Sequence, residues 1–148
     1  ASFKMKTWLD EGKIIVANRY VSANMGHQGG KILDKDKRQA YYKWLDNYEY
    51  NVFKIPRPDL VIWLKIPPER AQELVDQKAS RQYLPGIVKR DGHEADLTHL
   101  ERAHQAYAEM ARLFPNFATI ECLDSGQLLT IEQIGDRVWS SVQALFSK

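Results

Sequence analysis

The sequence holds little that would support a disulfide, a thiolate metal site or a membrane span. Its 148 residues include one cysteine, Cys122, so an internal disulfide and a site with paired cysteine ligands are both excluded. The longest apolar run, 60–64, is too short to cross a bilayer, and the first ten residues are polar and amphipathic, unlike a signal peptide. These absences predict a soluble, cytoplasmic protein with no membrane partner.

A concentrated run of charges of one sign is also lacking. The 21 Lys and Arg residues are interleaved with 19 Asp and Glu residues, and the net charge is +2. Domains that bind nucleic acid usually carry a basic stripe, so we expect no nucleic-acid partner. In contrast, 44% of the residues are hydrophobic, which is enough for the core of a single domain over residues 1–148.

Short apolar segments alternate with amphipathic ones along the chain. Runs rich in β-branched residues predict buried strands at 13–17, 60–65 and 118–122. Helical spacing of apolar residues predicts helices at 1–9, 36–49, 69–78, 96–114 and 130–146. Gly12 suits the end of the first helix, and Thr130 with Gln133 predicts a capping box for the last. Apolar strands separated by helices indicate the α/β class, with a parallel sheet flanked by helices on both faces.

Two groups of side chains are expected to be structural. Tyr41, Trp44 and Tyr48 recur at helical spacing, which is more typical of a core than of a base-stacking platform. The buried face of the last helix is expected to consist of Ile131, Ile134, Val138, Val142 and Leu145. His93, His99 and His104 share no single ligand spacing, and we assign no residue as a metal ligand.

The segment 18–30 is expected to be a glycine-rich loop after the first strand, where ligands bind in open α/β sheets. Arg19 would follow the end of that strand, and its planar guanidinium suits a phosphate contacted at two points. The amides of Asn24 and Gln28 can donate and accept hydrogen bonds, as recognition of a base edge requires. The residues alone leave a second interpretation open, in which Arg19 forms a structural ion pair and the glycines only make a turn.

Several motifs occur in an order and spacing that resemble the thymidylate kinase family. The likeness runs from about residue 12 to residue 146, and the segment near 80–94 falls where these enzymes carry a lid. Each motif is weak alone, but together they are fairly specific. The motifs are Asn18-Arg19-Tyr20 followed by Gln28-Gly29, similar to DRY…YQG; Pro56-Arg57-Pro58-Asp59-Leu60, similar to the segment before the family's fourth strand; and Ile66-Pro67-Pro68-Glu69-Arg70-Ala71, similar to the turn after it.

This resemblance implies a fold like that of P-loop kinases and a nucleotide kinase activity. The γ-phosphate of ATP would pass to a nucleoside monophosphate, converting dTMP to dTDP for dTTP biosynthesis, with ATP and Mg²⁺ as cofactors and a homodimer packed through helices. Arg19 would hold the acceptor phosphate and balance charge in the transition state. Arg81, Lys89 and Arg90 would close over the ATP phosphates as catalytic lid residues. The implied acceptor-binding residues are Asn18, Arg19, Asn24, His27 and Gln28.

The sequence departs from the family pattern at three positions. Asn18 replaces the aspartate of DRY, and an amide is a poorer partner than a carboxylate for Mg²⁺. Ser22 lies one place before the family's serine, and Ala23 takes that place. His27 takes the position of a tyrosine that lies against the deoxyribose, so the resemblance does not fix the acceptor as dTMP.

The 148 residues also lack a G-x-x-x-x-G-K-[ST] phosphate-binding loop. The nearest string, Gly30-Lys31, has Met25 in place of the first glycine and Ile32 in place of the hydroxyl residue. We expect the loop and the first strands to lie upstream of Ala1, in a further portion of the protein, another chain or a proteolytic partner. In the family fold, the missing strand would lie between segments 13–17 and 60–65.

Three functional hypotheses follow. The first is a nucleotide kinase completed by the missing segment. The second is a catalytically silent nucleotide-binding or interaction module, favoured by Asn18 and by the missing loop. The third is a related kinase that acts on another nucleotide or nucleoside.

Overall fold

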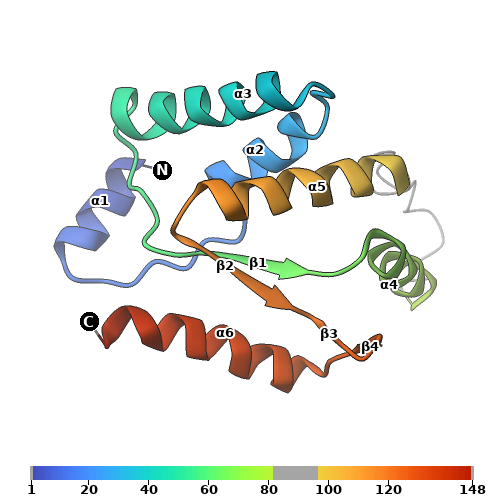
Figure 1. Ribbon diagram of the computed structural model, residues 1–148. Helices are drawn as coiled ribbons and strands as arrows, with labels where there is room; N and C mark the ends of the chain where they lie inside the picture. The colour runs from blue at the N-terminus through green and yellow to red at the C-terminus, as the bar shows by residue number, and fades with distance from the viewer. Residues whose placement is uncertain (1, 82–96, 148) are drawn as a thin grey trace. The chain divides into compact units, whose positions relative to one another are not determined.

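The computed structural model describes residues 2–81 and 97–147 (Figure 1). The chain forms two compact units, Ala1–Asp59 and Leu60–Lys148. The first contains α1 (Ser2–Asp10), α2 (Val21–Gly29), α3 (Lys35–Asn47) and the π-helical turn η1 (Tyr48–Val52). The second contains β1 (Val61–Lys65), α4 (Pro68–Arg81), α5 (Leu97–Leu113), β2 (Phe117–Glu121), β3 (Leu123–Asp124), β4 (Gln127–Leu128) and α6 (Ile131–Phe146). The mixture of helices with a small parallel sheet is compatible with the predicted α/β class, and the single-domain organisation stays a prediction.

Helix α1 ends at the glycine that the sequence indicates. Gly12 has a φ of 76°, a left-handed conformation that costs glycine little. The amide of Lys13 donates to the carbonyl oxygen of Trp8 at 2.9 Å, which satisfies a carbonyl at the end of the helix. The predicted end of the first helix is therefore confirmed.

The segment 13–17 is not a strand, and this prediction is wrong. It pairs with no strand among residues 2–81 and 97–147. Ile14 is 74% and Val16 93% exposed, while Ile15 is half-buried. β-Branched residues favour an extended backbone, but a strand also requires a neighbour that accepts and donates its ladder hydrogen bonds. The sequence shows the β-branched residues, but it does not show whether a neighbouring strand is available for pairing.

Helix α2 occupies most of the segment that the glycines predicted as a loop, so this prediction is wrong over Val21–Gly29. Val21 and Met25 lie one turn apart and are both buried. Gly29 lies directly against the ring of Tyr42 on α3, and a Cβ atom there would be 2.4 Å from Cε1 of that ring. This glycine therefore permits two helices to pack closely instead of permitting a turn.

Helix α3 begins at a side-chain cap and buries a charge near its start. The carboxylate of Asp34 accepts a hydrogen bond from the amide of Lys37 at 2.9 Å. The guanidinium of buried Arg38 donates to the carbonyl oxygens of Ile32 and Leu33 at 2.6 and 3.2 Å. These bonds compensate the burial of the charge and fix the connection from α2 to α3.

A column of aromatic rings follows one side of α3 into η1. Trp44 stacks on Tyr41 and on Tyr48, with ring centroids 6.0 and 5.3 Å apart, and Tyr48 contacts Phe53 at 4.5 Å. Trp44 is 56% and Tyr48 38% exposed, so the expectation that they belong to the core is wrong. The fully buried aromatic of this helix is Tyr42, which lies on the face that meets α2.

The second unit is built on two parallel strands. β1 pairs with β2 from Val61 opposite Phe117 to Lys65 opposite Glu121, which confirms the two predicted strands. Helices α5 and α6 both contact β2, and α4 contacts α5 (Figure 1). The ring of Trp63 stacks on Tyr107 at 5.9 Å and meets the edge of His104 at 5.2 Å, which holds α5 against β1.

The β1–β2 pair has a free edge on β1 within the described part of the chain, because β2 is the one strand paired with it there. The buried side chains of this unit are Ala103, Ala106, Met110, Ile120 and the free cysteine Cys122. Helices on both faces of a larger sheet stay a prediction.

A short hairpin that sequence analysis missed leads into α6. β3 and β4 are antiparallel and are joined by Ser125 and Gly126, with φ angles of 48° and 80°. The Asp-Ser-Gly sequence is typical of a hairpin turn and could have predicted this one. The capping box is confirmed: the Gln133 amide donates to Oγ1 of Thr130 at 3.2 Å, and the Thr130 amide donates to Oε1 of Gln133 at 2.9 Å.

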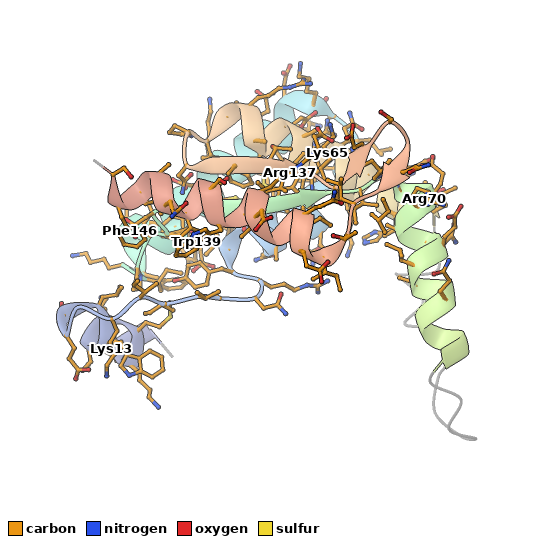
Figure 2. The ribbon with its side chains drawn as sticks, turned by 90° about the horizontal axis from the view of Figure 1, so that it is seen from below. Lys13, Lys65, Arg70, Arg137, Trp139 and Phe146 are labelled. Carbon is orange, nitrogen blue, oxygen red and sulfur yellow. The ribbon has the colours of Figure 1, made fainter. Side chains whose placement is uncertain are left out.

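The apolar face of α6 is only partly covered, which corrects the predicted buried face. None of the helix's described side chains is buried; Ile134, Val138 and Val142 are half-buried, while Ile131 and Leu145 are exposed. Trp139 and Phe146, labelled in Figure 2, are 57% and 65% exposed. As for membranes, no helix in the described ranges combines the length and apolar character needed to cross one.

The contact between α2 and α3 generates a test with a matched control. Gly29→Ala would place a methyl group against the fully buried ring of Tyr42, and we expect overpacking to lower the free energy of unfolding by about 1–3 kcal/mol. Gly135→Ala, in α6, meets no atom within 4 Å and should raise it by about 0.5–1 kcal/mol through helix propensity. Urea unfolding followed by circular dichroism measures both; equal effects of the same sign would contradict the packing described for α2.

Candidate functional site

The bend before α2 presents two of the residues singled out from the sequence. Asn18 and Arg19 are both exposed. Arg19 has a φ of 67°, a left-handed conformation that is uncommon for a residue other than glycine and persists only where the surroundings impose it. The expectation that Arg19 stands at the tip of a buried strand is wrong, because 13–17 is not a strand. Arg19 instead lies immediately before a helix.

The first turn of α2 begins directly after Arg19. Tyr20 is the N-cap residue, in an extended conformation, and its side chain makes no cap hydrogen bond. Its carbonyl oxygen accepts from the amide of Ala23 at 3.0 Å. A helix N-terminus favours negative charge through its amide groups and its dipole. This part of the chain therefore places a permanent positive charge beside a helix end that prefers anions.

The other residues expected to contact the acceptor lie on one stripe of α2. Asn24, His27 and Gln28 are separated by three and four positions, so they are neighbours on the helix surface. Asn24 and Gln28 are exposed, and His27 is half-buried. The structure thus brings these three residues together, but on a helix and not on the loop that the sequence predicts.

Residues to which the sequence assigned no role hold the start of α2, and two of them, Asp46 and Tyr50, belong to none of the motifs. The hydroxyl of Tyr20 donates to the carbonyl oxygen of Pro56 at 3.0 Å. The adjacent Arg57 donates to both carboxylate oxygens of Asp46, at 2.7 and 2.8 Å, and its guanidinium carbon lies 4.1 Å from the ring centre of Tyr50. The proline-rich segment 56–58 can be recognised in the sequence, but its partners cannot. Tyr20 lies 36 residues before Pro56, and Asp46 lies 11 residues before Arg57.

Burial and charge raise the pKa of two tyrosines in this cluster. For Tyr50, burial raises the pKa well above its ordinary value, with Tyr20 and the carboxylates of Asp46 and Glu49 acting in the same direction and Arg57 opposing them. Burial, followed by the charge of Glu49, raises the pKa of Tyr20. The hydrogen bonds to Asp46 raise the pKa of Arg57. Both phenols therefore keep their protons at neutral pH, and the Tyr20 hydroxyl remains a hydrogen-bond donor.

The predicted lid residues are largely beyond what the structure describes. Arg81 is the last residue of α4, and its side chain is outside the described part of the structure. Lys89 and Arg90 lie outside the described residues. Their roles over the ATP phosphates stay predictions.

The carboxyl ends of the two parallel strands carry charges that neutralise one another. Nζ of Lys65 lies 2.6 Å from Oε1 of Glu121, and Arg137 of α6 donates to the carbonyl oxygen of Glu121 at 2.7 Å. Figure 2 labels Lys65 of β1 and Arg137 of α6. Because these groups already have partners, the strand ends offer less free charge than the bend before α2. In the described ranges, no three His, Cys, Asp or Glu side chains gather where they could hold a metal ion.

The chain is similar to curated thymidylate kinases. It is 31% identical over 124 residues to the thymidylate kinase of Alkalilimnicola ehrlichii, covering 82% of this chain and 49% of that protein. It is 23% identical over 121 residues to a probable thymidylate kinase of Thermococcus gammatolerans, with the same coverage of 82% and 49%. It is 28% identical over 98 residues to the thymidylate kinase of Mycobacterium tuberculosis, covering 66% of this chain and 44% of that protein.

These matches support the family resemblance over part of the relatives only. The chain spans about half the length of the curated relatives it matches. No family model matches the chain, and no solved structure matches it.

The tyrosine cluster predicts how stability depends on pH. Because their pKa values are raised, Tyr20, Tyr41 and Tyr50 hold their protons more tightly in the folded state than in the unfolded state. The corresponding stability is fully present below the ordinary tyrosine pKa of 10.0 and is lost as the pH rises through the folded values. We expect the free energy of unfolding to fall above about pH 10, and to fall less steeply in Tyr50→Phe. Urea unfolding at pH 8 and pH 11 measures this; an equal slope in both proteins would contradict the burial of Tyr50.

Proposed function

We propose that this chain is the acceptor-binding portion of a thymidylate kinase, which transfers the γ-phosphate of ATP to a deoxynucleoside monophosphate and forms dTDP from dTMP. The observation that carries this proposal is Arg19, exposed and held in a left-handed conformation at the start of α2. The same residue belongs to the Asn18-Arg19-Tyr20 string that resembles the family's signature, and the chain is similar to thymidylate kinases over most of its length.

In this proposal Arg19 and the first amides of α2 bind the acceptor phosphate. Phosphoryl transfer requires positioning and neutralisation of charge more than covalent chemistry, and a guanidinium can contact two phosphate oxygens at once. Asn24 and Gln28 would contact the base or sugar along the α2 stripe, with His27 beside them. Asn18 would lie next to the transferred group.

ATP and Mg²⁺ would be bound mainly by a portion of the protein outside these 148 residues. The sequence contains no G-x-x-x-x-G-K-[ST] loop. Asn18 replaces the family's carboxylate with an amide, which is a weak ligand for Mg²⁺. This chain's residues therefore fit the acceptor better than they fit the metal.

Features of each unit support a missing segment that contains a strand. In the first unit, 13–17 is mostly apolar and largely exposed. In the second, β1 has a free edge among the described residues, and the apolar face of α6 is partly uncovered. Unpaired strand edges and exposed apolar faces are costly in an isolated domain. We propose that the phosphate-loop portion supplies the missing strand, and that the complete protein is a cytoplasmic homodimer.

The alternative is a silent nucleotide-binding module. Asn18 favours it, because loss of the carboxylate weakens the metal site while leaving the phosphate-binding arginine in place. The two hypotheses agree on acceptor binding and differ on turnover.

Acceptor binding is tested by Arg19→Ala. We expect dTMP to bind roughly 10- to 100-fold more weakly, because a charge-assisted contact to phosphate is lost, while thymidine, which has no phosphate, binds as before. Isothermal titration calorimetry of both ligands measures the ratio. Arg112→Ala, which removes the same charge from the last turn of α5, is the matched control and should change neither affinity. Equal weakening of dTMP and thymidine, or no weakening, would remove Arg19 from the phosphate site.

Turnover separates the two hypotheses. The chain produced together with a segment that carries the phosphate-binding loop should phosphorylate dTMP in a coupled ADP-release assay, whereas the 148 residues alone should not. Parallel assays with dUMP, UMP and CMP determine the acceptor, and Asn18→Asp should increase the rate by restoring a carboxylate near the metal. Binding of dTMP without turnover, both in the completed protein and in its Asn18→Asp variant, would favour the silent module.

A further inference from the structure

Three irregular features of the first unit's backbone converge on one hydrogen bond. Arg19 and Lys54 are the two non-glycine residues with positive φ among this unit's described residues, at 67° and 53°. The π-helical turn η1 lies between them in sequence. The Tyr20 hydroxyl, next to Arg19, donates to the Pro56 carbonyl oxygen, two residues after Lys54, at 3.0 Å. Strained residues and π-helical turns concentrate at functional sites, where the surrounding structure imposes them.

The residue that follows the acceptor, Arg57, is held by its side chain. Arg57 forms two hydrogen bonds with the carboxylate of Asp46, at 2.7 and 2.8 Å, and stacks on the ring of Tyr50 at 4.1 Å. Asp46 belongs to α3 and Tyr50 to η1, so both partners are presented by consecutive helical segments. Arginine suits this role because its planar fork satisfies a carboxylate at two points while its face remains available to a ring.

This geometry fixes the position of the Pro56 carbonyl group. Pro56 and Pro58 restrict the backbone on both sides of Arg57, because each proline ring fixes φ. With the Arg57 side chain held at two points and against a ring, the short segment 56–58 has little freedom to move relative to α3. Isolated surface ion pairs contribute little, but bidentate geometry is the recognised exception. The side chain of Asp46 is 21% and that of Arg57 46% exposed, so solvent screens this pair in part and its effect rests on geometry.

We propose that Asp46, Arg57 and Tyr50 form a positioning clamp for Arg19, acting through the hydrogen bond from Tyr20 to Pro56. The clamp holds Tyr20, the N-cap residue of α2, and thereby maintains the left-handed backbone that presents the Arg19 guanidinium beside the helix N-terminus. None of the clamp residues contacts the acceptor in this proposal, so they are positioning residues. The inference rests on the proposed function, because it gives the clamp a purpose only if Arg19 binds the acceptor phosphate.

Two conservative variants test the clamp without removing a buried apolar group. Tyr20→Phe keeps the ring and loses the hydrogen bond to Pro56, and Asp46→Asn keeps the size of the side chain and loses its charge. Each should weaken dTMP binding by roughly three- to tenfold while thymidine binding is unchanged. The double variant should be no weaker than the more affected single variant, because both substitutions disrupt the same path. Tyr48→Phe and Glu73→Gln, at an exposed ring and at the exposed ion pair with Arg70, are the matched controls.

A second measurement reports the backbone of Arg19 without any ligand. A positive φ brings the amide proton close to the α proton of the same residue, which gives a strong intraresidue NOE in the NMR spectrum. We expect this NOE at Arg19 in the wild-type chain and in both controls. The NOE should weaken in Tyr20→Phe and Asp46→Asn, while the chemical shifts of the remaining residues stay those of the folded protein.

The outcomes separate the clamp from the proposed function. If the wild-type chain prefers dTMP and Arg19→Ala abolishes that preference, but both clamp variants keep the preference and the NOE, the clamp is overturned and the proposed function stands. If the wild-type chain shows no preference for dTMP over thymidine, the proposed function fails. In that case the NOE alone decides whether the clamp fixes the backbone of Arg19. Additive losses in the double variant would show that Asp46 and Tyr20 act separately, which also overturns the clamp.

Discussion

The hydrogen bond from the Tyr20 hydroxyl to the Pro56 carbonyl oxygen is the interaction on which the candidate site depends. It joins the start of α2 to a segment 36 residues later and is 3.0 Å long. A neutral hydrogen bond is worth only about 1 kcal/mol in net stability. Its effect here is geometric, because it sets the N-cap residue and the left-handed residue before it. The rest of the first unit supports this bond: α2 packs on α3 through Gly29 and Tyr42, and α3 presents the carboxylate that holds Arg57.

The site that results is suited to recognise an anion and a polar ring system in neighbouring positions. The guanidinium of Arg19 and the first turn of α2 supply positive charge, and the amides of Asn24 and Gln28 follow along the same helix. The second unit lacks a comparable group of free charges at its described strand ends, since Lys65 is paired with Glu121. In the proposed function, a phosphorylated nucleoside binds at this site on α2.

The sequence predicts correctly the elements that depend on neighbouring residues. Its predictions fail where a residue distant in the sequence determines the structure. The capping box of Thr130 with Gln133, the glycine after α1 and the apolar strands 61–65 and 117–121 were all recognisable, because each depends on residues within one turn or one run. Residues 13–17 have the composition of a strand but no pairing partner in the part of the chain that the structure describes. The sequence predicts a loop around Gly29, because no local signal shows that Tyr42 packs against this glycine. The site residues on α2 came from the family resemblance, whereas Asp46, Tyr50 and Arg57 act through contacts that no short motif encodes.

The central claim is that Arg19 receives the phosphate of the acceptor nucleotide. The most direct measurement is an experimental structure of the chain with dTMP bound. Our account predicts that the phosphate oxygens lie within hydrogen-bond distance of the Arg19 guanidinium and face the first turn of α2, with Tyr20 still bonded to Pro56. A phosphate bound elsewhere, with Arg19 directed into solvent, would contradict it.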